Sequence, residues 1–224
     1  MNTSLAILSV GAVPVDEIMP LLTEDIPEQQ ITHLSLLGRL SADEVTEDYG
    51  ASAHEKTLQV QPGDGPLMIL SHQKVEQALQ AVIEVLDAQG YDVIMVLGGG
   101  YFPGLTTRSA ILLVPDRIVP PLVASIVDGH QVGILLPALQ ELTAQQQKWQ
   151  GLEMPPIYGP EASLSDDAAL VHAGGELKTR GADVLVLDCL GFQQRHRDLL
   201  QKSLEIPVLL SHTLVARLAS ELLL

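Results

Sequence analysis

The sequence predicts an α/β protein in which mainly parallel sheets are flanked by helices, arranged as two similar lobes. Three observations lead to this fold class. Apolar segments typical of strands alternate with helical patterns along nearly the whole chain. Residues 91–100, YDVIMVLGGG, contain an almost continuous apolar run, which is the mark of a parallel sheet covered on both faces. Residues 90–102 also match residues 181–192 in pattern, which indicates an internal duplication.

The first elements follow from short apolar runs and the residues that end them. Residues 4–11 are an apolar run closed by glycine, and the spacing after it predicts a helix over 15–24. A second strand is expected at 31–38. Ser41 and Glu44 have the spacing of a capping box, in which each side chain bonds the other residue's backbone N–H, so a helix is expected to begin there.

The rest of the chain keeps the same alternation. Segment 56–70 predicts two strands around a Gly/Pro turn, and the clearest helix covers 71–90. Pro120 and Pro121 are expected to start the next helix late or to kink it. Further strands are expected at 131–137, 155–159, 182–188 and 206–211. Further helices are expected at 116–129, 138–150, 166–181, 194–205 and 213–223.

Charge and cysteine content limit the function. The 224 residues carry a formal net charge of −16, which repels nucleic acids and anionic membranes. We therefore expect a small-molecule ligand and neither of those partners. The first residues lack a positively charged segment before the apolar run, and one cysteine cannot form an internal disulfide, so a cytoplasmic location is expected. The apolar C-terminal segment could dock on the first lobe or join a homo-oligomer.

The two matching segments align at an offset of 91 residues. The aligned pairs share glycine, aspartate or an aromatic ring: Gly90 with Gly181, Asp92 with Asp183, Gly100 with Gly191 and Tyr101 with Phe192. At this offset Gly98 falls on Cys189, the one cysteine. Ligands of open parallel sheets bind beyond the carboxyl ends of the strands, so a loop from each lobe is expected to line one cleft. Alternatively, two βα units of one fold share such a pattern by physical necessity.

Several segments together are similar to the AroM family: LAILSVGAVP (5–14), GYDVIMVL (90–97), PDRIVPPLVASI (115–126) and LDCLGF through HRDLL (187–200). The resemblance covers essentially the whole chain. More distantly, this family resembles the aspartate/glutamate racemase superfamily, whose fold has two pseudo-symmetric α/β lobes with the active site in the cleft between them. The resemblance implies a first lobe of residues 1–111 plus 208–224 and a second lobe of residues 112–207.

The same resemblance implies a chemistry for the cysteine. Racemases of that superfamily carry one cysteine in each lobe, on opposite faces of a bound carboxylic acid. Cys189 matches the second-lobe cysteine, whereas Gly98 stands at the first-lobe position, so racemisation by two thiols is excluded. Many AroM-like sequences have Cys-Thr-Gly where this chain has three glycines. Arylmalonate decarboxylases resemble this arrangement, with one cysteine that protonates a carbanion and a glycine loop whose N–H groups bind the developing negative charge.

The candidate site follows from these positions at the strand ends. Cys189 is the candidate catalytic residue. The candidate substrate-binding residues lie in the loops that follow apolar strands: Gly11, Gly98, Gly99, Gly100, Tyr101, Pro137, Leu190, Gly191 and His212. The glycine loop lacks both dinucleotide and P-loop spacing, and the remaining histidines lack the spacing of metal ligands. We therefore expect a small carboxylic acid as ligand, no cofactor and no metal.

Alternative interpretations stay open for each candidate. Cys189 can be a small apolar residue of the core, because cysteine is among the residues most often buried. Asp188 should point away from the thiol, and it can cap a helix or anchor a turn. His196 and Arg197 can bind an anion or face solvent. Two function classes remain: a cofactor-independent isomerase or decarboxylase acting at the carbon next to a carboxylate, and a non-catalytic carboxylate-binding or regulatory protein.

Overall fold

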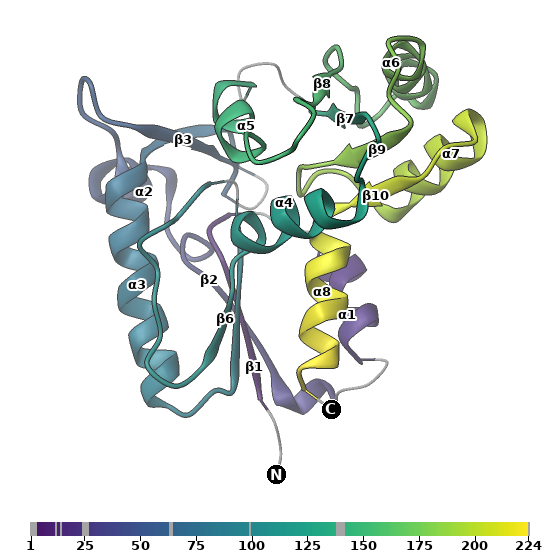
Figure 1. The fold of residues 1–224 in the computed structure, drawn as a ribbon. Coiled ribbons are helices and arrows are strands. Elements are labelled where there is room, and N and C mark those ends of the chain that lie inside the picture. The colour runs from purple at the N-terminus through teal and green to yellow at the C-terminus, as the bar shows by residue number, and fades with distance from the viewer. Residues whose placement is uncertain are drawn as a thin grey trace. The chain divides into compact units, whose positions relative to one another are not determined.

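The computed structural model divides the chain into two compact units (Figure 1). It describes residues 4–11, 13, 15–23, 27–62, 65–98, 100–137 and 142–223. Unit 1 comprises Met1–Val15, Met19–Pro115 and Ala216–Leu224, and unit 2 comprises Asp16–Ile18 and Asp116–Val215. The two lobes expected from the family resemblance, 1–111 plus 208–224 and 112–207, stay a prediction.

Unit 1 is built on a four-stranded parallel sheet. Its strands are β1 (Leu5–Ser9), β2 (Ile31–Ser35), β5 (Val93–Leu97) and β6 (Ile111–Leu113). They pair in the order β2-β1-β5-β6. Every residue of β1 and β5 is buried, as expected for apolar strands covered on both faces. β6 could not be predicted from the sequence, because three residues after a turn-rich stretch are too few to show a strand period.

Smaller elements of unit 1 confirm two further expectations. The strands β3 (Thr57–Val60) and β4 (Met68–Ser71) form an antiparallel pair around the expected turn. Helix α2 (Ala42–Tyr49) begins after Ser41, whose side chain accepts from the backbone N–H of Glu44 while the Glu44 carboxylate accepts from the N–H of Ser41. Both bonds of the capping box are therefore present.

Helix α3 (His72–Ala88) covers the unit 1 sheet (Figure 1). One face of this helix packs into the same core as the strands and contributes Val75, Leu79, Ile83 and Leu86. These residues recur at helical spacing, as the sequence predicts. Two other helices, α1 (Val15–Thr23) and α8 (Ser211–Glu221), contribute residues to both units, and a short 3₁₀ turn, η1 (Glu28–Gln30), precedes β2.

Unit 2 contains a second four-stranded parallel sheet. Its strands are β7 (Val132–Leu135), β8 (Ile157–Tyr158), β9 (Val184–Leu187) and β10 (Val208–Leu210). Its helices are α4 (Pro115–Ile126), α5 (Leu142–Lys148), α6 (Asp167–Thr179) and α7 (Gln194–Leu204). α4 begins at Pro115 and continues through Pro120 and Pro121, so a late start is wrong. No helix among the described residues is both long and apolar enough to cross a membrane.

The two sheets have the same topology, which supports the internal duplication. In unit 2 the strand order is β8-β7-β9-β10, so in each unit the first strand lies between the second and the third, and the fourth pairs with the third. β5 and β9 are therefore equivalent third strands.

The residues before these two strands also match. Gly90 and Gly181 precede them with φ of 87° and 101°, a conformation that favours glycine. Asp92 accepts from the N–H of Ser4 at 2.8 Å, and Asp183 pairs with His130 at 3.0 Å.

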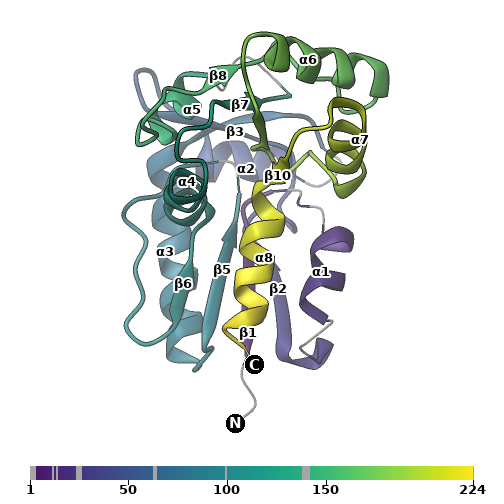
Figure 2. The ribbon, with the colours of Figure 1, turned by 45° about the vertical axis from the view of Figure 1, so that its right-hand side comes forward.

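Helices α6 and α7 of unit 2 pack closely against each other, and Figure 2 shows them side by side. At Gly174 of α6, a Cβ atom would lie 2.8 Å from Leu204 Cδ1 and 2.9 Å from Leu200 Cδ2, both on α7. These leucines are buried in the unit 2 core together with residues of β9. A glycine at 174 therefore lets the two helices approach closely.

Candidate functional site

Cys189 lies in a tight turn at the carboxyl end of β9. The strand is wholly buried, and the turn is closed by the N–H of Phe192, which donates to the carbonyl of Cys189 at 3.2 Å. Phe192 is buried, which anchors the turn in the unit 2 core. The Cys189 side chain is half-buried and packs at the edge of that core.

A backbone amide points at the cysteine sulfur. The N–H of Gly191 donates to Cys189 Sγ at 3.5 Å. A donor so placed stabilises negative charge on sulfur. Helix α7 begins only at Gln194, so the amide next to the sulfur belongs to the turn and not to the first helical turn. A Cβ at Gly191 would lie 2.7 Å from Leu164 Cδ1, so a larger residue there would displace the Leu164 side chain.

Asp188 has a role that the sequence analysis did not predict. Its carboxylate accepts from Lys148 Nζ at 2.8 and 2.9 Å, from Trp149 Nε1 at 2.9 Å and from Ser211 Oγ at 2.7 Å. Lys148 also pairs with Asp116 at the start of α4. Asp188 therefore fixes the chain before the cysteine turn through side chains of other elements, and not as a helix cap. These residues are distant in sequence, so no local spacing could reveal the contact.

Burial and charge act in opposite directions on this network. Burial alone would raise the pKa of Asp188, but the Lys148 ammonium and the hydrogen bonds hold it below its ordinary value. Burial, together with the nearby Asp188 carboxylate, raises the pKa of Asp116 above its ordinary value although Lys148 acts to lower it. Burial would lower the pKa of Lys148, but both carboxylates raise it above its ordinary value. Partial burial, together with the Asp188 carboxylate, raises the pKa of the half-buried Tyr158 to about 12.

His212 lies at the end of the neighbouring strand. It follows β10 as the second residue of α8, and β10 pairs with β9 through Leu210 and Leu187. Its side chain is buried, and Nε2 has no hydrogen-bond partner among the described residues. Burial lowers the pKa of His212 to about 4, so the imidazole is neutral at pH 7.

The other unit 2 candidates lie at the same edge of the sheet. Pro137 follows β7, and Leu190 follows Cys189 in the turn after β9; both are half-buried. Since β7, β9 and β10 are neighbours and parallel, their carboxyl ends meet at one edge. Unit 2 thus brings Pro137, Cys189, Leu190, Gly191 and His212 to a common rim.

The unit 1 candidates lie at the corresponding edge of their own sheet. Gly11 follows β1 and Gly98 follows β5, and the N–H of Val10 donates to the carbonyl of Leu97 at 3.1 Å. A Cβ at Gly98 would lie 2.7 Å from Val10 Cγ2, and one at Gly11 would lie 2.4 Å from Val60 Cγ1. Both glycines are therefore required by packing. Gly99 lies outside the described residues, and Gly100 follows it in the loop.

A histidine that the sequence analysis did not select anchors this loop. His72 Nε2 lies 2.6 Å from the carbonyl oxygen of Tyr101, and its ring stacks on Phe102 at 5.0 Å. Phe102 is buried, whereas Tyr101 is 48% exposed. Phe102 is thus the buried aromatic residue of this loop, as Phe192 is in the turn after β9, while Tyr101, which the sequence pairs with Phe192, is exposed. Lys56 Nζ lies 6.0 Å from the centre of the Tyr101 ring.

His196 and Arg197 have structural partners. His196 is buried; its Nδ1 accepts from the N–H of Gln193 at 2.9 Å, and its Nε2 lies 3.1 Å from the carbonyl oxygen of Leu164. The ring therefore holds the start of α7. Arg197 pairs with Asp198 at 3.0 Å. The sequence predicts that His196 either binds an anion or faces solvent, and the buried, hydrogen-bonded ring does neither.

Other polar surfaces of unit 2 lie elsewhere. A shallow hollow along α6 is lined by His172, Gly175, Glu176, Thr179 and Arg180. His172 and Glu176 form an exposed pair there at 3.2 Å. Within the described ranges, no three His, Cys, Asp or Glu side chains gather as metal ligands would.

Comparison with solved structures defines the class of fold. Unliganded arylmalonate decarboxylase matches with a TM-score of 0.58 at 15% identity, covering 98% of this chain and 92% of that one. Glutamate racemase from Francisella tularensis in complex with D-glutamate matches with a TM-score of 0.58 at 12% identity, covering 99% and 81%. Picrophilus torridus aspartate racemase matches with a TM-score of 0.53 at 12% identity, covering 97% and 94%. The protein therefore has an α/β fold of the aspartate/glutamate racemase type.

Sequence comparison gives the family. The family model described as AroM protein matches residues 5–223. The chain belongs to the AroM family, as its segments predict. No curated protein sequence matches the chain.

Proposed function

We propose that the protein is a cofactor-independent enzyme that acts at the carbon next to a carboxylate, with Cys189 as its catalytic acid. The observation that carries this proposal is the turn at the end of β9, which holds a half-buried thiol beside the amide of Gly191. The likeness to arylmalonate decarboxylase and to glutamate and aspartate racemases supports it as an analogy of fold.

One thiol is sufficient for decarboxylation or for one-base proton transfer. When a carboxylate leaves as carbon dioxide, the electron pair of the broken bond stays on the adjacent carbon. The thiol of Cys189 then donates its proton to that carbon, and the resulting thiolate takes a proton from water before the next turnover. The N–H of Gly191 stabilises the thiolate in the interval. Racemisation by two thiols is excluded, because Cys189 is the only cysteine of the chain.

His212, just after the strand that neighbours β9, is the candidate ligand contact. A buried polar atom without a partner is rare, because leaving it unpaired costs about 1–3 kcal/mol. A neutral imidazole with an unpaired Nε2 can accept a hydrogen bond from a ligand oxygen or, in the other tautomer, donate one to it. We therefore propose His212 as a hydrogen-bond partner of the substrate. Gly11 and the loop from Gly98 to Tyr101 stay predicted carboxylate-binding residues.

The test is a search for turnover with small malonates, dicarboxylates and aromatic acids in D₂O, monitored by NMR. The expected result is loss of carbon dioxide or incorporation of deuterium at the carbon next to the carboxylate. Cys189→Ser should lower the rate by about 10²–10⁴-fold, the usual contribution of a general acid, while substrate binding persists. Gly151→Ala, on an open stretch of unit 2, is the control and should leave the rate unchanged. Turnover in Cys189→Ser at the wild-type rate would contradict the proposal.

A non-catalytic carboxylate-binding protein is the second candidate. This candidate is favoured by Gly98, because a two-thiol racemase has its first cysteine at this position. A Cβ at Gly98 would lie 2.7 Å from Val10 Cγ2, so the packing here is fitted to glycine. This candidate predicts saturable binding of an acid in calorimetry with no turnover, and equal affinity in Cys189→Ser.

A further inference from the structure

Three largely buried charges meet beside the candidate catalytic turn. Asp116, Lys148 and Asp188 form what we call the charge cluster, in which Lys148 Nζ bridges both carboxylates. Their side chains are 13%, 10% and 3% exposed, in that order. They come from the start of α4, the end of α5 and the end of β9. All three belong to unit 2.

Stability alone does not account for such a cluster. Removing ions from water is unfavourable, and replacing a buried ion pair by apolar residues is often neutral or stabilising. The cluster also holds two carboxylates and one ammonium, so its charges do not balance when all three are ionised. What distinguishes it is its location, because Asp188 directly precedes Cys189.

The cluster fixes the chain on one side of the thiol. The carboxylate of Asp188 accepts from Lys148, Trp149 and Ser211, and its carbonyl accepts from Gln145 Nε2 at 3.4 Å. On the other side, the N–H of Phe192 donates to the carbonyl of Cys189. The thiol is therefore held from both sides, which matters because a reacting group must be placed within a fraction of an ångström.

We propose that Lys148 is a positioning residue for Cys189. By bridging Asp116 and Asp188 it fixes the end of β9 and keeps Sγ against the N–H of Gly191. Lys148 also offsets the negative charge of Asp188, which would otherwise oppose a thiolate one residue away. The inference rests on the proposed function, since it gives Lys148 a purpose only if Cys189 reacts.

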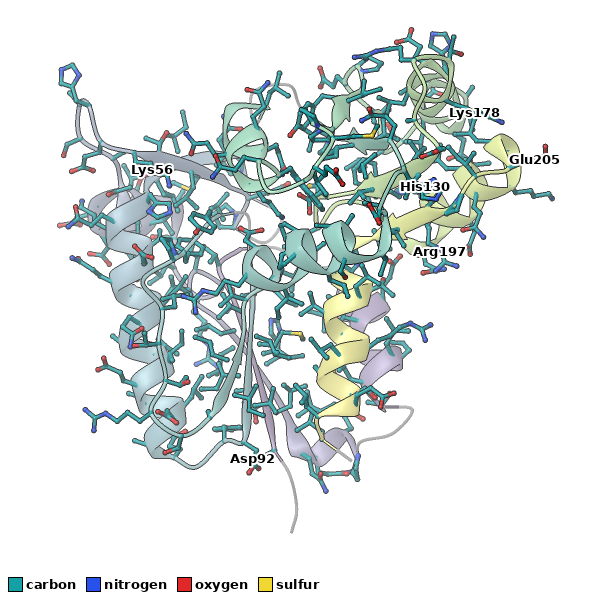
Figure 3. The ribbon with its side chains drawn as sticks, in the orientation of Figure 1. Lys56, Asp92, His130, Lys178, Arg197 and Glu205 are labelled. Carbon is teal, nitrogen blue, oxygen red and sulfur yellow. The ribbon has the colours of Figure 1, made fainter. Side chains whose placement is uncertain are left out.

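The test measures the rate at which iodoacetamide alkylates Cys189 between pH 5 and 9, together with unfolding in urea. Lys148→Met should slow labelling at pH 7 by about tenfold or more and move the midpoint of the pH profile upward, because one pKa unit is a factor of ten. Lys148→Arg keeps a cation between the carboxylates and should restore most of the rate. The control is Lys178→Met, which removes another lysine of unit 2 (Figure 3) whose ammonium donates to the carbonyl of Leu204 at 2.6 Å; it should not change labelling.

A second variant separates positioning from stability and charge. Asp116→Asn combined with Lys148→Met removes the bridge but leaves the net charge of the cluster unchanged. It should regain stability relative to Lys148→Met while its labelling stays slow. Labelling at the wild-type rate and pH profile in either folded variant would overturn the inference, as would failure of both variants to fold. If Cys189 of the wild-type protein is labelled only in denaturant, both this inference and the proposed function are overturned. If Cys189 is labelled fast and the Lys148 substitutions do not change the rate, only this inference is overturned.

Discussion

At the scale of single residues, Gly98 and Cys189 occupy matching positions after the equivalent strands β5 and β9. The sequence alignment predicts this pairing, and the common topology of the two sheets supports it. The structure adds the reason for glycine at 98, which is the proximity of the buried Val10 side chain. A contact between residues 88 positions apart could not be read from the sequence.

Introducing a cysteine at position 98 should therefore destabilise the protein. The Cβ of Gly98→Cys would lie 2.7 Å from Val10 Cγ2, and overpacking of this kind costs about 1–3 kcal/mol. Urea unfolding measures the loss. Gly151→Cys is the matched control, because a Cβ there meets nothing within 4 Å, and it should change stability by less than about 0.5 kcal/mol. Combining Gly98→Cys with Val10→Ala should be less destabilising than the sum of the single changes; simple additivity would contradict this account of Gly98.

His212 should make stability depend on pH below neutrality. Its pKa falls from the ordinary value of 6.5 to about 4 on folding, so below pH 6.5 the unfolded chain binds a proton that the folded protein does not. Stability from this residue is present above pH 6.5 and is lost as the pH falls toward 4, with a loss of about 2 kcal/mol at pH 5. His212→Gln cannot titrate, so urea unfolding at pH 7 and pH 5 should show a loss smaller by that amount. Equal losses in both proteins would show that His212 is not held neutral.

At the scale of elements, sequence periodicity was most successful where a whole strand or helix face is buried. The apolar strands β5 and β9 and the amphipathic helix α3 were predictable, because burial imposes a pattern on every residue. β6 was missed because three residues show no pattern. The close approach of α6 and α7 was also beyond reach, because it depends on the facing side chains of two separate helices.

Two adjacent glycines of α6 should respond oppositely to alanine. Gly174→Ala would place Cβ against Leu200 and Leu204 and should destabilise the protein by about 1–3 kcal/mol despite the better helix propensity. Gly175→Ala meets only Leu204 Cδ2 at 3.9 Å, so it should gain up to about 1 kcal/mol from propensity. Thermal or urea unfolding of the two variants makes the comparison. A gain at both positions would contradict the packing described for α6 and α7.

At the scale of the whole molecule, the similarity of the two units was visible in the sequence. The side-chain contacts that hold the candidate catalytic turn were not. The offset that aligns Gly90 with Gly181 also aligns the third strands of the two sheets. The network around Asp188 was not predictable, because it joins α4, α5, β9 and α8 across 96 residues, from Asp116 to Ser211. Local patterns define the elements and their order, while contacts between distant side chains emerge only from the fold.

The duplication itself makes a prediction about equivalent glycines. Gly90→Ala and Gly181→Ala each place a side chain at positive φ, where a Cβ meets no neighbour within 4 Å, so backbone strain is the main effect. Each should lose about 1–2 kcal/mol in urea unfolding, by similar amounts. Gly151→Ala, without positive φ and equally open, should be neutral or slightly stabilising. An unchanged stability at either position would contradict the equivalence of the two helix-to-strand turns.

The central claim is that Cys189 is a reactive thiol at a ligand site, and the most direct measurement is its rate of alkylation by iodoacetamide in the native protein. The rate should be followed from pH 5 to 9, with and without a panel of small dicarboxylates and aromatic acids. We expect fast labelling already near pH 7, because the Gly191 amide stabilises the thiolate, and protection by at least one acid. Labelling that occurs only after unfolding in denaturant would contradict the account and would make Cys189 a residue of the core.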